Sequence, residues 1–373
     1  MGIEIKEVLT KGDLKKFVKF PFKLYKGNQY WAPPFIKDEI KTLSKDINPA
    51  FENCRAKYWL AYKDGKLAGR IAGIINNVLI EKWKVKKARF GWIDFIDDKE
   101  VSKALFNAVE KWAKENGLES IEGPMGFTDL DEEGMLIEGF EEQGTYPMIY
   151  NYSYYPEHLK RLGYEKEVDW LEFEVKVPEE IPEKIVRVNN LIMKRSKLRL
   201  LDAKKTKEYK PYIQGFWKII EEAYADLFGA VPLSEKQKEF YTDQYFGFII
   251  PEYSKFILNE KNELIAAGIA FPSFTKALRK ARGRLFPFGA LYMLYAIKHP
   301  EVLDFYLIGV KKEYQGNGVI SIMMNEINQN AIDNGIRVCE TSGELEDNKA
   351  VQDMWRHYEH RQHKRRRCFI KTL

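Results

Sequence analysis

The stretch Tyr306–Glu340, with the sequence YLIGVKKEYQGNGVISIMMNEINQNAIDNGIRVCE, contains the elements that decide the fold. We expect a strand that ends at Val310, a turn at Gln315–Gly318, a helix from about Val319 and then a second strand. Two glycines in a turn that opens directly into a helix let the backbone approach a ligand and direct unpaired N–H groups at one point. The pattern therefore predicts an anion site, most naturally for phosphate.

The turn resembles the Arg/Gln-x-x-Gly-x-Gly/Ala motif of the GNAT superfamily of acyl-CoA N-acyltransferases, in which this loop holds the pyrophosphate of coenzyme A. Ile320 stands where the family has Gly or Ala, and the other motif positions hold Gln315, Gly316, Asn317, Gly318 and Val319. The resemblance implies acetyl-CoA, or another acyl-CoA, as the cofactor. It also implies that backbone amides of Ile308, Gly309 and Val310 bind the pantetheine arm. An ordinary strand-to-helix connection is the alternative interpretation of this turn.

A second copy of the unit appears when the sequence is slid on itself by 218 positions, the separation of Gly91 and Gly309. Seven residues of the first copy then coincide with identical residues of the second: Gly91, Val101, Asn107, Ala113, Asn116, Gly117 and Glu122 meet Gly309, Val319, Asn325, Ala331, Asn334, Gly335 and Glu340. In the turn the copies differ, because Asp97–Glu100 lies opposite Gln315–Gly318. Carboxylates at this place would repel a pyrophosphate. We therefore expect only the second copy to bind coenzyme A.

The repeat predicts two tandem GNAT-like domains of the α/β (α+β) class, each with a mixed, mainly antiparallel sheet flanked by helices. The first, degenerate domain is expected over residues 1–178, closed by a strand at Tyr164–Val177. A connector follows over 179–197. The acyl-CoA-binding domain is expected over 198–373, with its own last strand in the tail Asn348–Leu373.

Bulk composition excludes several classes of protein. The chain has 373 residues, enough for two domains with separate cores. No apolar run approaches the ~18–20 residues of a membrane span, and the charged start lacks a signal peptide, so we expect a cytoplasmic protein with no membrane partner. Three scattered cysteines predict neither a disulfide framework nor a metal site. A net charge of +5 is mild and does not call for nucleic acid.

Acyl transfer to an amine needs a general base, and Asp304 is the first candidate. It begins the central strand, eleven residues before Gln315, where some members of the family carry a catalytic Glu. Desolvation inside an apolar strand would raise its pKa and suit it to this role. The alternative is a solvent-exposed strand end. Glu340 is the second candidate, although its match to Glu122 of the first copy argues for a structural role.

The general acid is less clearly indicated. The family often places a tyrosine seven residues after an asparagine on the last helix. Asn348 takes the asparagine position and is assigned to the cofactor site, but the seventh residue after it is Trp355, which is no acid. Tyr358, one helical turn further, is the candidate acid; otherwise the thiolate leaves unassisted.

Two charged segments carry further alternatives. The acidic stretch Asp129–Glu133 lacks the ligand count of a calcium loop and is expected to be a solvated loop. The insertion Thr275–Pro300, which precedes the central strand, combines a basic run with aromatic residues and is a place for specificity. Together with the basic tail, this insertion leaves open a third hypothesis, that the protein is an RNA-associated module.

The sequence thus predicts an acyl-CoA-dependent N-acyltransferase, with acetyl transfer to a primary amine by direct attack in the second domain. The acceptor is a small molecule or a peptide. The alternative is a catalytically silent protein that binds coenzyme A or another partner on the same fold. Acceptor, acyl length and oligomeric state are left open.

Overall fold

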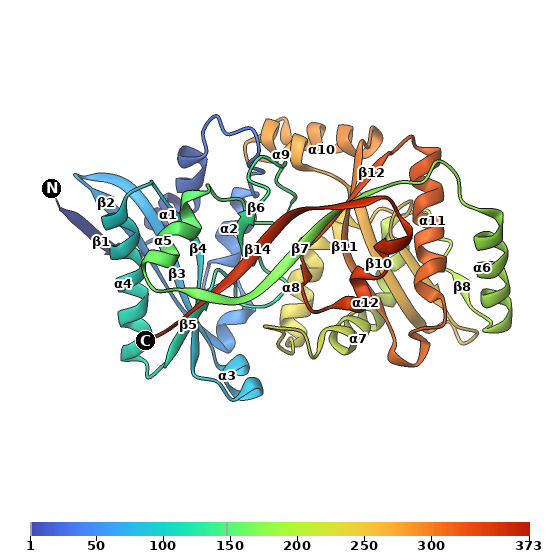
Figure 1. Cartoon of the computed structure of the whole chain (residues 1–373), viewed down its shortest axis with the longest axis horizontal. Coiled ribbons are helices and arrows are strands. Elements are labelled where there is room, and N and C mark those ends of the chain that lie inside the picture. Colours follow the sequence, from blue (N-terminus) through green and yellow to red (C-terminus); the bar gives the residue numbers. More distant parts are fainter. Residues whose placement is uncertain (1, 147) are drawn as a thin grey trace.

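The computed structural model describes residues 2–146 and 148–373; Met1 and Pro147 lie outside the described residues. Within these ranges fourteen strands form one sheet that runs through the whole molecule (Figure 1). The strand order along the sheet is β1-β2-β3-β4-β5-β14-β7-β12-β11-β10-β9-β8, with β6 and β13 beside the path. Helices flank the sheet, so the α/β class expected from the sequence is confirmed.

The first half of the chain supplies seven strands: β1 Ile3–Glu7, β2 Cys54–Lys63, β3 Lys66–Asn76, β4 Lys87–Phe95, β5 Ser120–Gly123, β6 Met135–Glu138 and β7 Glu165–Lys176. Its helices are α1 Lys11–Leu24, α2 Ile36–Thr42, α3 Asn77–Trp83, α4 Lys99–Glu115 and α5 Tyr154–Arg161. Helix α4 packs its apolar side on β2 and β3, where it buries Val101, Leu105 and Val109.

The second half supplies β8 Arg199–Leu200, β9 Lys255–Leu258, β10 Leu264–Pro272, β11 Val302–Val310, β12 Val338–Thr341, β13 Glu344–Leu345 and β14 His360–Thr372. Its helices are α6 Glu183–Arg195, α7 Ile213–Tyr224, α8 Glu235–Tyr245, α9 Thr275–Ala281, α10 Gly289–Lys298, α11 Val319–Asp333 and α12 Lys349–Gln352. Short 3-10 turns cover Pro49–Glu52, Thr206–Tyr212, Phe246–Phe248, Lys312–Tyr314 and Trp355–His357.

The repeated unit has the same form in both halves. Strands β4 and β5 pair in parallel across α4, as β11 and β12 do across α11. Each helix stops at an Asn-Gly pair whose glycine has a positive φ, +75° at Gly117 and +72° at Gly335. Glycine takes this left-handed conformation without steric cost, which explains why both copies end the helix in the same way.

The two closing strands are exchanged between the halves. Strand β7 pairs with β12, where Glu174 lies opposite Glu340, and β14 pairs with β5, where Phe369 lies opposite Gly123. The two strands also pair with each other from His360 to Ile370, and Figure 1 shows them crossing the centre side by side. From the sequence we expected each closing strand to complete the sheet of its own half. In the structure each closing strand instead pairs with a strand of the other half. Residue ranges for separate domains stay a prediction, because the sheet is continuous.

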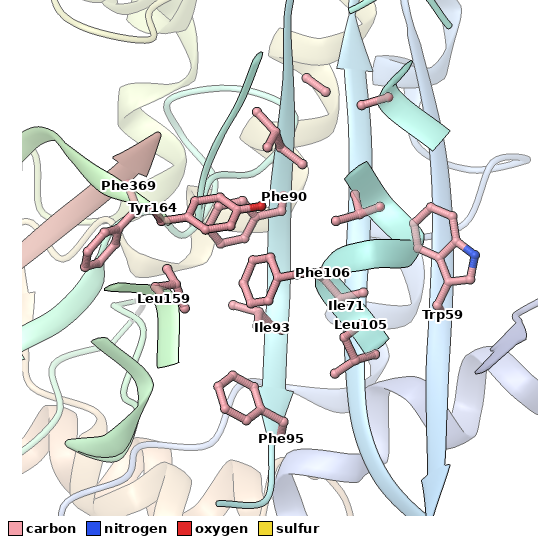
Figure 2. Close-up of a cluster of buried hydrophobic side chains, with 14 of the residues drawn as sticks. Trp59, Ile71, Phe90, Ile93, Phe95, Leu105, Phe106, Leu159, Tyr164 and Phe369 are labelled. Atoms are coloured by element: carbon pink, nitrogen blue, oxygen red, sulfur yellow. The ribbon is translucent and has the colours of Figure 1, made fainter. Parts of the chain in front are cut away.

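The packing of the apolar cores shows the same exchange of closing strands. Figure 2 shows Phe369 of β14 beside Tyr164, Phe90 and Phe106 in the core of the first half. The rings of Phe90 and Phe106 lie 5.1 Å apart at a steep angle. In return, Leu171, Phe173 and Val175 of β7 pack in a cluster that includes Met324 and Ile327 of α11. Each half therefore completes its core with the other half's strand.

A buried ion cluster joins the exchanged strands. Glu172 of β7 is fully buried and pairs with Arg366 of β14. Lys364 Nζ lies 3.1 Å from Glu172 Oε2 and 3.4 Å from Glu340 Oε2, and it donates to the backbone oxygen of Gln143 at 3.0 Å. Removing one member of such a cluster leaves an uncompensated charge in the interior.

We expect Glu172→Gln to lower the free energy of unfolding by about 3–5 kcal/mol at pH 7. Burial opposes ionisation of Glu172, but Arg366 and Lys364 outweigh it and lower the pKa from 4.5 to about 2. The stabilisation by the carboxylate is therefore present above pH 4.5 and lost as the pH falls toward 2. Denaturant unfolding at a series of pH values measures this loss.

The matched control is Glu359→Gln, which removes an exposed partner of Lys176 and should cost at most about 1 kcal/mol at any pH. Equal effects of the two substitutions would contradict a stabilising role for the buried cluster.

Candidate active site

Strands β11 and β12 separate after Phe305, ahead of the glycine turn Gln315–Gly318. They pair only from Val302 to Phe305 on β11, after which β11 continues to Val310 while β12 ends at Thr341. The backbone N–H of Ser342 donates to the oxygen of Phe305 at 3.0 Å, and its hydroxyl donates to the oxygen of Tyr306 at 3.1 Å. These bonds fix the point at which the strands part.

A cavity of about 190 Å³ lies where the strands part. Three segments form much of its wall: Phe305–Ile308 of β11, Thr341–Leu345 after the end of β12, and Asp129–Glu133 from the first half. Trp170 of β7 and Trp355 also line it. Both halves of the chain therefore enclose one site.

The predicted cofactor residues fall in two places. Ile308 and Asn348 line this cavity, whereas Gly309, Val310 and the turn Gln315–Val319 lie outside its lining. The carbonyl oxygen of Ile308 accepts a hydrogen bond from the hydroxyl of Tyr224 at 3.2 Å. The roles of these residues in binding coenzyme A stay predictions.

The turn has the backbone form that an anion site requires. Gly316 and Gly318 have φ values of +75° and +77°, and Gln315 Nε2 donates to the oxygen of Val310 at 3.0 Å. Gly318 is the N-cap of α11, and no side chain of the described residues caps this helix. The first N–H groups of α11 are thus left for a ligand, so the residues present fit a diphosphate.

Helix α6 lies against the start of α11. A Cβ on Gly318 would meet Ile192 Cδ1 at 2.6 Å, and Asn189 exchanges hydrogen bonds of 3.1 and 3.2 Å with Ser321. Position 318 therefore requires glycine for two reasons: Ile192 lies too close to allow a Cβ, and the φ value is positive. Ile320, the departure from the family motif, packs in the apolar clusters around Met323 and Met324.

In the first half the equivalent helix start carries its own carboxylate. Asp98 is the N-cap of α4, and its Oδ1 accepts from the N–H groups of Glu100 at 3.0 Å and Val101 at 3.2 Å. A salt bridge to Lys63 is the main cause that lowers the Asp98 pKa. The N–H groups that bind an anion in such a turn are already occupied by Asp98.

Asp304 is buried beside the ion cluster rather than in the cavity. It is 2% exposed, and within the described residues neither carboxylate oxygen has a hydrogen-bond partner. Burial, and then the neighbouring Glu340 carboxylate, raise the Asp304 pKa well above its ordinary value, which is the predicted direction. Glu340 Oε2 accepts from Thr145 Oγ1 at 2.7 Å and faces Lys364. Neither residue lines the cavity, so their catalytic roles stay predictions.

Tyr358 also lies behind the cavity wall. Its hydroxyl accepts from Asn328 Nδ2 at 3.1 Å, and its ring packs 6.2 Å from that of Trp355. Trp355, at the position where the family often has the tyrosine, is the residue of this pair that lines the cavity.

Glu344 is a titratable residue of the cavity that was not expected from the sequence. Its Oε1 accepts from Trp355 Nε1 at 2.8 Å, and its Oε2 is buried with no hydrogen-bond partner among the described residues. Burial raises the Glu344 pKa from 4.5 to about 7, although the polar side chains of Trp355 and Thr341 lower it. A carboxyl group with this pKa is suited to proton transfer near neutral pH. The sequence feature that could have pointed to Glu344 is its position four residues after Glu340, the second candidate base.

The acidic stretch is not the solvated loop that the sequence predicted. Asp129–Glu133 is half-buried against the cavity, and burial raises the pKa of Glu132 and Glu133 well above the ordinary value. Burial raises the Asp131 pKa to about 6, and Asp131 Oδ1 accepts from the Tyr241 hydroxyl at 3.1 Å. Glu133 Oε2 is buried and has no partner among the described residues. The cavity therefore has an acidic wall.

A second, apolar cavity of about 50 Å³ adjoins the first. Aromatic residues such as Phe216, Trp217 and Phe248 line it. The two cavities share four lining residues: Leu130, Ile269, Tyr306 and Leu307. An apolar group attached to a ligand in the first cavity would find a matching environment here.

Comparison with known proteins supports this architecture. The chain superposes over its whole length on 98% of a tandem GNAT protein from the clavulanic acid biosynthesis pathway, with a TM-score of 0.56 and 10% identity. A probable N-acyltransferase from Enterococcus faecalis V583 matches all of the chain and 73% of its own length, with a TM-score of 0.53 and 8% identity. The chain has the tandem GNAT fold.

Two curated proteins are similar in sequence. Protein YghO of Escherichia coli K12 is 27% identical over 376 residues, which cover 99% of this chain and 95% of that protein. A bacterial ceramide synthase of Caulobacter vibrioides is 26% identical over 352 residues, which cover 92% and 91%. No protein-family model matches the chain.

Trp355 stands at the position where the family motif predicted a tyrosine, and its Nε1 donates a hydrogen bond to Glu344. Within the described residues, no cluster of His, Cys, Asp and Glu is arranged to hold a metal ion.

The pKa of Glu344 predicts a pH-dependent effect of Glu344→Gln on stability. Because the folded-state pKa is raised to about 7, ionisation destabilises the native protein as the pH rises from 4.5. The neutral Gln variant should equal the wild type near pH 4 and exceed it by up to about 3 kcal/mol above pH 7. Thermal and denaturant unfolding at both pH values measure the difference. A constant difference across this range would contradict the raised pKa.

The turn predicts a charge effect on binding of acetyl-CoA. Asn317→Glu places a carboxylate in the exposed turn and should weaken binding about tenfold, because it repels a diphosphate. Asn317→Gln has the same length without the charge and should bind as the wild type does. Isothermal titration compares the three proteins, and equal affinities for the Glu and Gln variants would show that the diphosphate binds elsewhere.

Proposed function

We propose that the protein is an acyl-CoA-dependent N-acyltransferase that acylates a primary amine carried on an apolar chain. The observation that carries the proposal is Glu344, a carboxyl group with a pKa of about 7 and an unpaired oxygen, in a cavity between parted strands. The GNAT fold supports acyl transfer in general terms, and the choice of amine and acyl group is our inference.

The donor would be held by the second half of the chain. The start of α11, bounded by Gly316 and Gly318, offers N–H groups to the diphosphate, and the parted edge of β11 leads from this turn to the cavity. An acyl-CoA supplies an acyl group activated as a thioester. Holding donor and acceptor together in this way can remove about 7–11 kcal/mol of the barrier in well-oriented cases.

Glu344 would serve as the general base. It accepts the proton that the amine loses as nitrogen bonds to the acyl carbon and the carbon–sulfur bond breaks. The hydrogen bond from Trp355 Nε1 to Oε1 fixes the carboxyl group and leaves Oε2 for the proton. Positioned groups of this kind typically contribute about 10²–10⁴-fold to the rate.

The acceptor would be bound by the first half of the chain. The unpaired oxygen of Glu133 offers the amine a hydrogen-bond acceptor in the acidic wall. The aromatic cavity next to it suits an apolar chain. A ceramide is a fatty acyl amide of a long-chain amino alcohol, so the similarity to a bacterial ceramide synthase supports an acceptor of this type.

The test is amide formation from a panel of acyl-CoA donors of different length with long-chain amino alcohols, short amines and a peptide amine. We expect product with the long-chain acceptors and a loss of about 10²–10⁴-fold in kcat for Glu344→Gln. The rate should rise with pH through about 7, as Glu344 ionises. Product from the peptide alone would overturn the apolar acceptor.

The matched control is Asp347→Asn, an exposed carboxylate three residues after Glu344, which should leave kcat unchanged. Binding of acetyl-CoA without turnover on any acceptor would instead support the catalytically silent alternative, in which Trp355 and Ile320 mark a lost activity.

A further inference from the structure

The segment Leu285–Tyr295, at the end of α9 and along α10, exposes an apolar patch. Phe286 is 77% exposed, and the other exposed members are Leu285, Phe288, Leu291, Tyr292, Leu294 and Tyr295. Figure 1 shows α9 and α10 along the upper edge of the molecule. Exposed apolar side chains that cluster in one segment, rather than lying singly, are typical of an interaction site.

The patch belongs to a helix that is apolar on two sides. Met293 is buried, and Ala296 and Ile297 pack against the aromatic core that contains Phe271 and Phe274. Leu291, Leu294 and Tyr295 recur at spacings of three and four and face outward. A helix that is apolar all round is normally buried, so the outer face of α10 lacks a partner in the isolated chain.

The backbone below the patch is fixed, so these side chains are held outward. The oxygen of Gly283 accepts from the N–H of Ile36 at 3.0 Å, and a Cβ on Gly283 would lie 2.5 Å from the oxygen of Pro34. The N–H of Ala290 donates to the oxygen of Leu285 at 2.7 Å. Exposure of Phe286 and Phe288 is therefore a property of the folded chain.

A basic groove borders the patch. Its lining includes eight cationic side chains, three from α1 and the residues after it and five from α9 and the following loop: Lys19, Lys23, Lys26, Lys276, Arg279, Lys280, Arg282 and Arg284. No Asp or Glu is among the described residues that line it, although Lys276 pairs with Glu301 outside the lining. Since the whole chain carries a net charge of only +5, positive charge is concentrated on this face.

Trp31, Phe286, Phe288 and Tyr292 lie among these cations in the groove lining. Apolar and aromatic side chains that project from a surface, ringed by Lys and Arg, are the composition of a face that sits in the headgroup region of an anionic bilayer. Aliphatic side chains such as Leu291 and Leu294 cannot stack on bases, which favours lipid over RNA.

We propose that α9, α10 and the loop between them dock the protein on the surface of a membrane that contains anionic lipids. The apolar patch enters the acyl boundary, and the cations of the groove contact the phosphates. Among the described residues no helix is long and apolar enough to cross a bilayer. Helix α10, with ten residues, is about 15 Å long and would lie in the interface. Docking here does not depend on the proposed acyl transfer.

The expectation of no membrane partner came from the absence of a spanning segment, and a surface-docking face needs no long apolar run. The inner face of α10 shares its apolar cluster with Tyr146 and Tyr306, which line the aromatic cavity. Docking at α10 would bring this part of the protein next to lipid, which suits an acceptor with an apolar chain.

The test is sedimentation of the full chain with vesicles of phosphatidylcholine alone and of phosphatidylcholine with 30 mol% phosphatidylglycerol. We expect binding to the anionic vesicles that weakens as salt is raised. Phe286→Asp and the double variant Lys280→Glu/Arg284→Glu should each weaken it at least about tenfold, roughly the effect of losing 1.4 kcal/mol. Circular dichroism and thermal unfolding check that each variant is folded.

Two control variants match these changes in exposure and charge. Leu9 is 79% exposed and does not line the groove, so Leu9→Asp repeats the change of Phe286 outside the proposed docking face. Lys205→Glu/Lys207→Glu repeats the charge change at two exposed lysines. Both should bind vesicles as the wild type does. Equal loss in the controls would overturn the proposal.

No sedimentation with either vesicle would also overturn it, whatever else the face binds. In that case, light scattering that shows a dimer lost in Phe286→Asp would assign the face to a second copy of the chain. A gel shift with RNA lost in Lys280→Glu/Arg284→Glu would assign it to nucleic acid.

Discussion

The exchange of β7 and β14 is the constraint on which the structure depends. A strand that leaves its own half must be fixed in the other, and the charges of Glu172, Lys364 and Arg366 meet where the two strands cross. In water such charges would attract each other weakly. In the interior, a charge without an oppositely charged partner strongly destabilises the fold. The cluster therefore opposes any register in which one strand slips past the other.

This crossing also determines where the cavity forms. Because β7 occupies the place next to β12, Trp170 of the first half reaches the site of the second, and the acidic stretch Asp129–Glu133 covers it from the same side. Both halves line the site, and burial among their residues is the largest influence on the pKa of Glu133 and Glu344. The degenerate first half of the chain therefore forms part of the cavity wall.

The local elements could be predicted from sequence because their signals are local. The glycine turn, the Asn-Gly helix stops and the repeat all appear in the structure, and so does the GNAT-like unit that they imply. The strand exchange could not, since the alternating pattern of a strand predicts which face it buries but not which sheet it joins. Glu344 and Glu133 were missed for a related reason: their pKa shifts arise from segments distant in sequence. Asp304 was correctly expected to have a raised pKa, but its distance from the cavity depended on tertiary packing.

Asp98 shows how one copy of a duplicated fold can satisfy its helix start with a side chain of its own. The N–H groups at the start of α4 need a negative partner, and Asp98 provides one from within the chain. Since it is covalently attached, its local concentration is fixed, and no dilute metabolite can compete with it on equal terms. The helix start of the first half is thereby satisfied from the moment the chain folds, without any small molecule, whereas the start of α11 has no side-chain cap among the described residues.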